Sequence, residues 1–245
     1  SVTKGLINLE DGTLISYPAY WETELLKKGI SREVNAIGGP CTSYELVFHD
    51  QTEVAFCGKS TAVIKMMKEA MQTSYYHIST TNDVIGLESA VALKNAYALG
   101  IALTIGLVNR RHGAEAGLHY NSQAGAFYQA TKEMTKLLRL QGADEDSTVL
   151  GIGDLYVTVY GGRTRKIGIL LGEGKTYEEA LNILAGVTLE SLVVARRVAK
   201  AIYRKAELGM VDLAEFPLMT HVNDVIDHGK DAELPWDAFT FDNTK

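Results

Sequence analysis

The stretch from residue 84 to residue 111 constrains the fold of this chain more than any other. Its sequence, VIGLESAVALKNAYALGIALTIGLVNRR, is long enough for about seven turns of α-helix. Polar residues at 80–83 can cap its first turn, and two arginines at its end suit the helix dipole. A helix that is apolar on almost every side is a buried helix. Its run without a charged or amide side chain, 96–108, is shorter than the roughly 20 residues of a membrane span, so we expect no span.

Lys94 is the exception on this helix. The residues three and four positions away from it are all uncharged: Ala90, Val91, Tyr97 and Ala98. A buried ammonium must be paired, neutralised or open to a cleft, because desolvation of a lone charge is costly. On these residues alone two interpretations stay open. Lys94 is either a structural lysine that pairs or reaches solvent, or a catalytic lysine with a tuned pKa.

The composition limits the class of protein. A chain of 245 residues with 46% hydrophobic residues suits one large or two small globular domains. The formal net charge of −6 argues against nucleic acid as the main partner. Cys41 and Cys57 have neither a metal-type nor a redox-type spacing, which fits the reduced cytoplasm. The histidines show no metal-ligand spacing either, so we expect no metal.

The predicted secondary-structure pattern of the chain changes near residue 82. Before it, short strand and helix patterns alternate, which is typical of a parallel α/β domain. After it, the patterns are helical, with helices predicted at 121–140, 162–171, 176–184, 188–207 and 217–228. The first three residues look like the end of a buried strand. A domain seldom begins inside a core strand, so we expect further residues of this domain to precede Ser1.

Two glycine-bearing segments could position a ligand. Residues 151–168, GIGDLYVTVYGGRTRKIG, are predicted to be a loop that holds Asp154 and then leads into a helix. Paired glycines, the helix start and Arg163 together favour a phosphate or carboxylate site, although a solvated basic helix start fits as well. Residues 38–45, GGPCTSYE, also place glycines before a helix. Neither segment is a Walker A loop, and the chain contains no G-x-G-x-x-G.

Taken together, these segments resemble the NAD(P)-dependent glycerol-3-phosphate dehydrogenase family. The resemblance is carried by TKGL near the start, GGPCTSYE, GLESAVALKNAYALGIALTIGL, GIGDLYVTVYGGRTRKIGILLGEG and NSQAGAF. It covers most of residues 1 to about 205. It implies an α/β partial Rossmann domain followed by an all-α C-terminal domain of the 6-phosphogluconate-dehydrogenase-like type. Residues 1–82 would then be the later part of the dinucleotide-binding domain, and residues 83–245 the helical substrate and catalytic domain.

The resemblance also implies a reaction and roles for four residues. Family members interconvert dihydroxyacetone phosphate and glycerol 3-phosphate by hydride transfer with NAD or NADP. Lys94 matches the general acid/base, and Asp154 matches the partner that orients its ammonium. Lys4 matches a second lysine that polarises the substrate and borders the nicotinamide. Asn95 would bond nearby polar groups.

Further positions are implied to bind ligands. The substrate-binding positions are Arg163, Thr164, Thr158, Gly39 and Cys41. The cofactor-binding positions are Lys4, Ser43, Arg163 and Glu190. Thr164 stands where the family has asparagine, Cys41 where it has serine, and Ser191 where it has glycine. The acid/base residues are intact while the substrate-end residues have changed, so a related polyol or sugar phosphate stays open as the substrate.

Two other interpretations remain. Ketopantoate reductases and other β-hydroxyacid dehydrogenases also place a lysine on a central helix, but Arg163 after two glycines favours a small phosphorylated substrate. From a different class, the chain would be an inactive fragment that only folds and self-associates. A homodimer is the candidate assembly.

Overall fold

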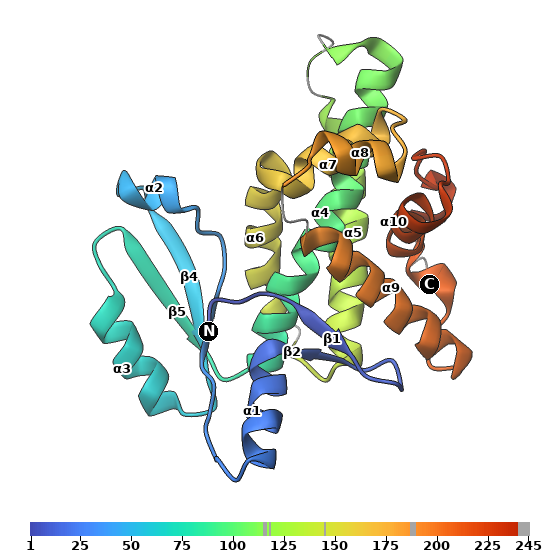
Figure 1. Cartoon of the computed structure of the whole chain (residues 1–245). Coiled ribbons are helices and arrows are strands. Elements are labelled where there is room, and N and C mark those ends of the chain that lie inside the picture. The colour runs from blue at the N-terminus through green and yellow to red at the C-terminus, as the bar shows by residue number, and fades with distance from the viewer. Residues whose placement is uncertain (115–116, 118, 145, 187–189, 240–245) are drawn as a thin grey trace, which may run out of the picture. The chain divides into compact units, whose positions relative to one another are not determined.

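The structure is a computed structural model that describes residues 1–114, 117, 119–144, 146–186 and 190–239 (Figure 1). The chain forms two compact units. Unit 1 comprises Ser1–Leu9, Thr13–Lys94 and Met134–Val157, and unit 2 comprises Glu10–Gly12, Asn95–Glu133 and Thr158–Lys245. Three helices contribute residues to both units: α4 (Val84–His112), α5 (Tyr120–Leu140) and α6 (Ser147–Tyr160).

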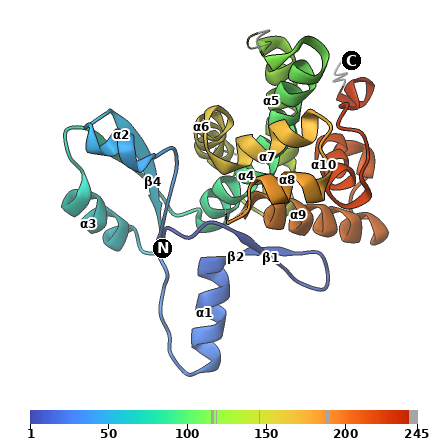
Figure 2. The same ribbon diagram turned by 45° about the horizontal axis from the view of Figure 1, so that its top comes forward.

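Unit 1 holds all the described strands. Its further elements are β1 (Leu6–Asn8), β2 (Leu14–Ser16), α1 (Tyr17–Lys27), β3 (Ala36–Gly38), α2 (Ser43–Val47), β4 (Thr52–Cys57), α3 (Thr61–Met71) and β5 (Tyr76–Thr81). Strands β1 and β2 form an antiparallel ribbon that leads into α1 (Figure 2). A second sheet has the order β3-β4-β5. The predicted alternation of strands and helices before residue 82 is therefore confirmed.

The expected all-parallel pairing is only partly right. Strands β4 and β5 are parallel and are joined through the 11-residue helix α3. Strands β3 and β4 are antiparallel. The helix between them, α2, has only five residues and spans about 7 Å, which is too little to carry the chain back along a strand.

The predicted buried strand at residues 1–3 is wrong. The Ser1 amino group donates to Asn35 O and the Ile37 N–H donates to Ser1 O, so one residue lies alongside β3. Val2 is 73% exposed, and residues 1–3 are not assigned to a strand. Two hydrogen bonds at a single residue do not extend into a ladder.

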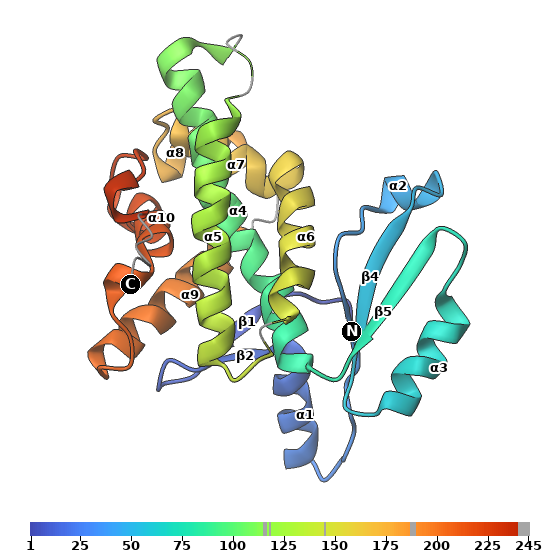
Figure 3. The same cartoon turned by 180° about the vertical axis from the view of Figure 1, so that it is seen from behind.

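Both faces of the three-stranded sheet are covered. On one face Ala36, Ala55 and Cys57 pack against Leu87 and Val91 of α4. On the other face Val54, Phe56 and Ile78 form a cluster that Met67 of α3 covers, and α3 lies beside β4 and β5 (Figure 3). The sheet thereby holds the first turns of α4 in unit 1.

Unit 2 is helical. Its further elements are α7 (Gly162–Gly172), α8 (Tyr177–Ile183), α9 (Glu190–Glu207), α10 (Pro217–His228) and two 3₁₀ turns at Leu213–Glu215 and Trp236–Phe239. All five helices predicted after residue 111 are present; residues 188 and 189 of the fourth lie outside the described residues. Helix α8 begins with a capping box between Thr176 and Glu179.

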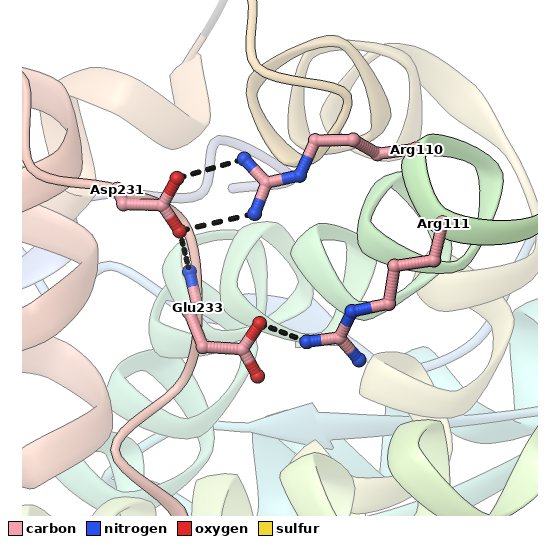
Figure 4. Close-up of polar contacts among 4 residues, drawn as sticks. All are labelled: Arg110, Arg111, Asp231 and Glu233. Carbon is pink, nitrogen blue, oxygen red and sulfur yellow. Dashed lines mark hydrogen bonds and ion pairs between the residues drawn. The ribbon is translucent and has the colours of Figure 1, made fainter.

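The C-terminal end of α4 is tied to the segment that follows α10. Arg110 contacts Asp231 with two nitrogens, at 2.7 and 3.1 Å, and Arg111 contacts Glu233 (Figure 4). The most apolar window of α4 is 94% buried, as in the core helix of a globular protein. Within the described residues no other helix is long and apolar enough to cross a membrane.

The predicted loop at 151–168 is wrong, because residues 147–160 form α6 and residues 162–172 form α7. Glycines in an apolar run suggested a loop. A Cβ on Gly151 would lie 2.6 Å from the Ala90 Cβ, and Gly153 lies over Pro40. Gly151 therefore serves close packing within a helix, where its cost of about 1 kcal/mol is offset by contact. A Cβ on Gly153 would make only an ordinary contact with Pro40.

Candidate active site

One carboxylate and two ammonium groups form a compact cluster in unit 1. Asp154 of α6 contacts Lys94 of α4 through Oδ1, and its Oδ2 lies 2.7 Å from the Lys4 Nζ. Asp154 is 2% exposed and Lys94 is 8% exposed, so both charges are buried. Lys4 keeps 26% of its side chain exposed, so the cluster meets solvent on the Lys4 side.

The surroundings of Lys94 tune its proton affinity. Burial lowers the pKa of Lys94 from 10.5 to about 8, because desolvation disfavours the ammonium. The Asp154 carboxylate opposes this fall, and the nearby Lys4 charge adds to it. The amine therefore exchanges a proton much closer to neutral pH than an ordinary lysine.

The segment after β3 belongs to the same unit. Gly39 has a φ of +125°, and a Cβ there would lie 3.1 Å from the Val54 Cα, so only glycine fits this turn. Cys41 is exposed, and partial burial of its sulfur raises the pKa of the thiol while Lys4 lowers it. Ser43 is exposed at the first residue of α2. This segment offers short polar groups close to strand β3.

The anion-binding candidates lie in unit 2, at the start of α7. Its N-cap is Gly161, which has no side chain to cap the helix, and Gly162 has a φ of +84°. Arg163 is exposed, and its side chain has no hydrogen bond or ion pair among the described residues. The neighbouring Thr164 is buried. Free N–H groups at a helix start beside an unengaged guanidinium are suited to bind an anion.

Three other predicted residues are also assigned to unit 2. Asn95, which follows Lys94 in α4, is partly buried. Thr158 in α6 is partly buried and has a partner in the protein. Glu190 is exposed at the first residue of α9. The structure thus brings together Lys4, Lys94 and Asp154 in unit 1. Asn95, Thr158 and Glu190 belong to unit 2 and are not part of this cluster.

Sequence reasoning missed two buried acids and one helix contact. Glu88 is 2% exposed and Glu133 is 0% exposed, and burial raises the pKa of each carboxyl to about 7. Each acid stands within a helical pattern of apolar residues, and this pattern could have identified both as buried. Arg165 donates to Val159 O at 3.1 Å and so caps the end of α6. That bond has no signal in the sequence, because α6 itself was not predicted.

Comparisons with known proteins agree on one family. Residues 83–236 match the sequence model of the C-terminal part of NAD-dependent glycerol-3-phosphate dehydrogenases. An NADP-dependent glycerol-3-phosphate dehydrogenase of Archaeoglobus fulgidus is 32% identical over 75% of this chain and 53% of its own length. A glycerol-3-phosphate dehydrogenase of Acidobacterium capsulatum, described as using NAD or NADP, is 29% identical over 92% of this chain and 62% of its own length. The chain therefore spans between about half and two thirds of these relatives.

Solved structures show the same fold. A crystal structure of glycerol-3-phosphate dehydrogenase from Coxiella burnetii superposes with a TM-score of 0.74 at 21% identity, covering 97% of this chain and 66% of that one. At this identity the likeness concerns the fold. It confirms the predicted fold class of a partial α/β domain followed by a helical domain.

Proposed function

Because this chain belongs to the NAD-dependent glycerol-3-phosphate dehydrogenase family, we propose that it serves hydride transfer between NAD(P)H and a small keto phosphate. The proposed substrate pair is dihydroxyacetone phosphate and glycerol 3-phosphate. The observation that carries the proposal is the buried Lys94 with its lowered pKa, held against Asp154 and beside Lys4. We also propose the division into 1–82 as cofactor part and 83–245 as substrate part, supported by the family match that begins at residue 83.

Lys94 is the proposed general acid/base. In the reducing direction its ammonium donates a proton to the carbonyl oxygen, and the neutral amine takes a proton back from solvent. In the oxidising direction the amine removes the proton from the alcohol. A pKa of about 8 suits both directions near neutral pH. Asp154 holds the ammonium in place, Lys4 adds positive charge beside the reacting oxygen, and Asn95 bonds polar groups nearby.

Arg163 is the proposed anchor for the substrate phosphate. A guanidinium without another partner among the described residues can give two charge-assisted hydrogen bonds to a phosphate. Thr164 and Thr158 add hydroxyl groups, and Gly39 and Cys41 are the proposed substrate contacts of the segment after β3. Threonine and cysteine at these positions also support a second candidate, a related polyol or sugar phosphate.

The residues of this chain fit the reactive end of a nicotinamide dinucleotide. Ser43, Arg163 and Glu190 have exposed polar side chains and Lys4 is partly exposed, and these four side chains would hold it. The sequence contains no G-x-G-x-x-G turn of the kind that binds the pyrophosphate of the dinucleotide. When bound, NAD(P)H supplies the hydride, and the residues of the cluster supply and remove the proton.

We also propose a cellular compartment and an assembly for the protein. Both cysteines are free thiols, Cys41 exposed and Cys57 buried, as expected in the reduced cytoplasm. A homodimer is the proposed assembly. The alternative of an inactive fragment that only self-associates is tested by running the activity assay on residues 1–245 alone as well as on the full-length protein.

The test is an NAD(P)H-oxidation screen of the full-length protein. Dihydroxyacetone phosphate, other ketose phosphates and ketopantoate are the substrates, and the Lys94→Ala variant is the control. We expect oxidation of NAD(P)H with a keto phosphate and none with the variant. If NAD(P)H binds but no substrate causes its oxidation, the proposed function is wrong. Oxidation with ketopantoate alone would favour the β-hydroxyacid dehydrogenases.

A further inference from the structure

The Lys94–Asp154 pair depends on the alignment of two helices. Lys94 belongs to α4 and Asp154 to α6, and the two helices are far apart in the sequence. A shift of one residue along either helix turns its side chain by about 100°. Such a shift would separate the two charges, so some feature of unit 1 must fix the register between these helices.

Asp83 connects the starts of both helices through one carboxylate. Its Oδ1 accepts the Gly86 N–H at 2.9 Å, which caps the first turn of α4. Its Oδ2 accepts the Ser147 hydroxyl at 2.7 Å and the Asp144 N–H at 2.8 Å. Ser147 is the first residue of α6. A single side chain therefore caps one helix and holds the other at its beginning.

The two helices also approach each other closely at two glycines, where no larger residue would fit. A Cβ on Gly86 would lie 1.9 Å from Asp83 Oδ2 and 2.5 Å from Ser147 Oγ. One turn further along, a Cβ on Gly151 would lie 2.6 Å from the Ala90 Cβ. Glycine at both levels lets α4 and α6 approach closely enough for the carboxylate to reach both.

Helices α4 and α6 contact each other at three points, and successive points are about one helical turn apart. Gly86 faces Ser147, Ala90 faces Gly151, and Lys94 faces Asp154. The steps along α4 are four and four residues, and those along α6 are four and three. Both correspond to about one turn, or about 5 Å. The helices therefore run in the same direction from the Asp83 anchor to the charge pair.

We propose that Asp83 is a positioning residue that sets the register of α4 against α6 and thereby brings Lys94 opposite Asp154. Its influence passes through the two helices, since it touches neither member of the pair in the contacts described. What the pair does in catalysis rests on the proposed function. The register itself does not.

The test reads the environment of Lys94 directly. The Asp83→Asn variant keeps an acceptor for Gly86 but loses an acceptor for Ser147, and Ser147→Ala removes only the hydroxyl bond. Thr81→Val is the matched control, because it removes the bond between Thr81 Oγ1 and the Asp83 N–H without touching α6. Lysine acylation by acetic anhydride at neutral pH is quantified by peptide mass spectrometry. Exposed Lys28 is the reference, and buried Lys205 of unit 2 reports unfolding.

We expect Asp83→Asn to increase acylation of Lys94 at least fivefold relative to Lys28, with a smaller increase for Ser147→Ala and none for Thr81→Val. Lys205 should stay protected in every variant. The proposal is overturned if Lys94 remains as protected as in the wild type. It is equally overturned if Lys94 and Lys205 lose protection together, since that result means general destabilisation.

Turnover of the full-length protein separates the two proposals. Asp83→Asn should lower kcat while leaving KM for the phosphorylated substrate within about twofold. A wild-type protein without any turnover would contradict the proposed function, yet the acylation pattern would still decide the role of Asp83. Unchanged kcat in a variant whose Lys94 is deprotected would contradict the positioning role.

Discussion

Each unit contains a deeply buried carboxylate, Asp154 in unit 1 and Glu133 in unit 2, and these two have opposite kinds of partner. Asp154 of unit 1 is 2% exposed and contacts the ammonium groups of Lys4 and Lys94. Glu133 of unit 2 is fully buried and, in the described part of the chain, accepts only from neutral donors. These are the Gln129 side chain at 2.8 Å and the N–H groups of Leu218 and Met219 at 2.7 and 3.0 Å.

The partners determine what each carboxylate does. The N-cap of α10 is Phe216, whose side chain cannot accept a hydrogen bond, so Glu133 of α5 caps α10 instead. Its donors are backbone and amide N–H groups, which are not acid/base groups near neutral pH. The partners of Asp154 are amines, one with a pKa near 8 that can release its proton. A buried acid among amines supports chemistry, whereas a buried acid at a helix start supports structure.

Replacement of Lys94 should have the largest effect, on rate and not on folding. Lys94→Met keeps an unbranched side chain one atom shorter and removes the transferable proton, so kcat should fall about 10²–10⁴-fold. Lys4 still pairs with Asp154, so the free energy of unfolding should fall by less than the roughly 3–5 kcal/mol of an unpaired buried charge. Steady-state kinetics and urea unfolding of the full-length protein measure the two quantities.

Lys94→Arg is the control for this prediction, because arginine keeps the positive charge but does not release a proton at ordinary pH. It should be as inactive as Lys94→Met. If either variant retains turnover within tenfold of the wild type, Lys94 is not the acid/base and the contrast between the two carboxylates loses its functional meaning.

Glu133 should make stability depend on pH. Burial raises the pKa of its carboxyl from 4.5 in the unfolded chain to about 7. Between these values the folded protein binds a proton that the unfolded chain has lost, so stability should fall as pH rises from about 4.5 to about 7. The expected loss is on the order of 3 kcal/mol. Urea unfolding of the wild type and Glu133→Gln at pH 5 and pH 8 measures it.

Glu88 in unit 1 must be separated from this effect, because burial raises the pKa of its carboxyl to about 7 as well. Glu88→Gln should remove its own share of the pH dependence and leave the share of Glu133. A Glu133→Gln variant with the same pH dependence as the wild type would show that Glu133 stays ionised in the fold. The carboxylate would then resemble Asp154 more than the comparison suggests.

Arg163 should affect the binding of ligands and not the stability of the fold. It lies at the start of α7 without a partner in the described residues, so its removal breaks no bond of the fold. Arg163→Ala should raise KM for the phosphorylated substrate about 10–100-fold, which is about 1.5–3 kcal/mol for a charge-assisted pair. Lys166→Ala is the control from the same helix start and should change KM by less than about threefold. Equal effects of the two variants would indicate a general basic surface.

Much of the fold could be predicted from local patterns. Helix α4 was predicted over 84–111 and is observed at Val84–His112, because capping residues, apolar content and terminal arginines all act within the helix. Helix α6 was missed because the reason for its glycine at 151 lies in Ala90 of another helix. The antiparallel pairing of β3 depends on how little chain α2 contains, which a pattern of alternating elements does not show.

The site was predictable in part for a similar reason. Lys94 stood out as the cation in the middle of an apolar helix, but only the family resemblance connected it with Asp154 and Lys4. The polar residues at 80–83 were expected to cap α4, and Asp83 is the one whose side chain caps its first turn. Its second oxygen binds Ser147, 64 residues away in the sequence, and such a contact leaves no periodic signal. Contacts of this kind need the fold to be known first.

Removal of the exposed ion pair of Arg110 and Asp231 should have the smallest effect on stability. It tests whether burial, and not geometry, determines how much a charged contact contributes. Arg110 lowers the pKa of Asp231 to about 2, and its two contacts are well formed (Figure 4). The Asp231 side chain is nevertheless 60% exposed. Asp231→Asn should therefore lower the free energy of unfolding by only about 0.2–1 kcal/mol, and the difference should vanish near 1 M salt.

Thermal melts at low and high salt measure this difference, with Glu233→Gln as the matched neighbour. A loss above about 2 kcal/mol that persists in salt would mean that geometry outweighs burial, and the contrast between Asp154 and Glu133 would then need to rest on their partners alone.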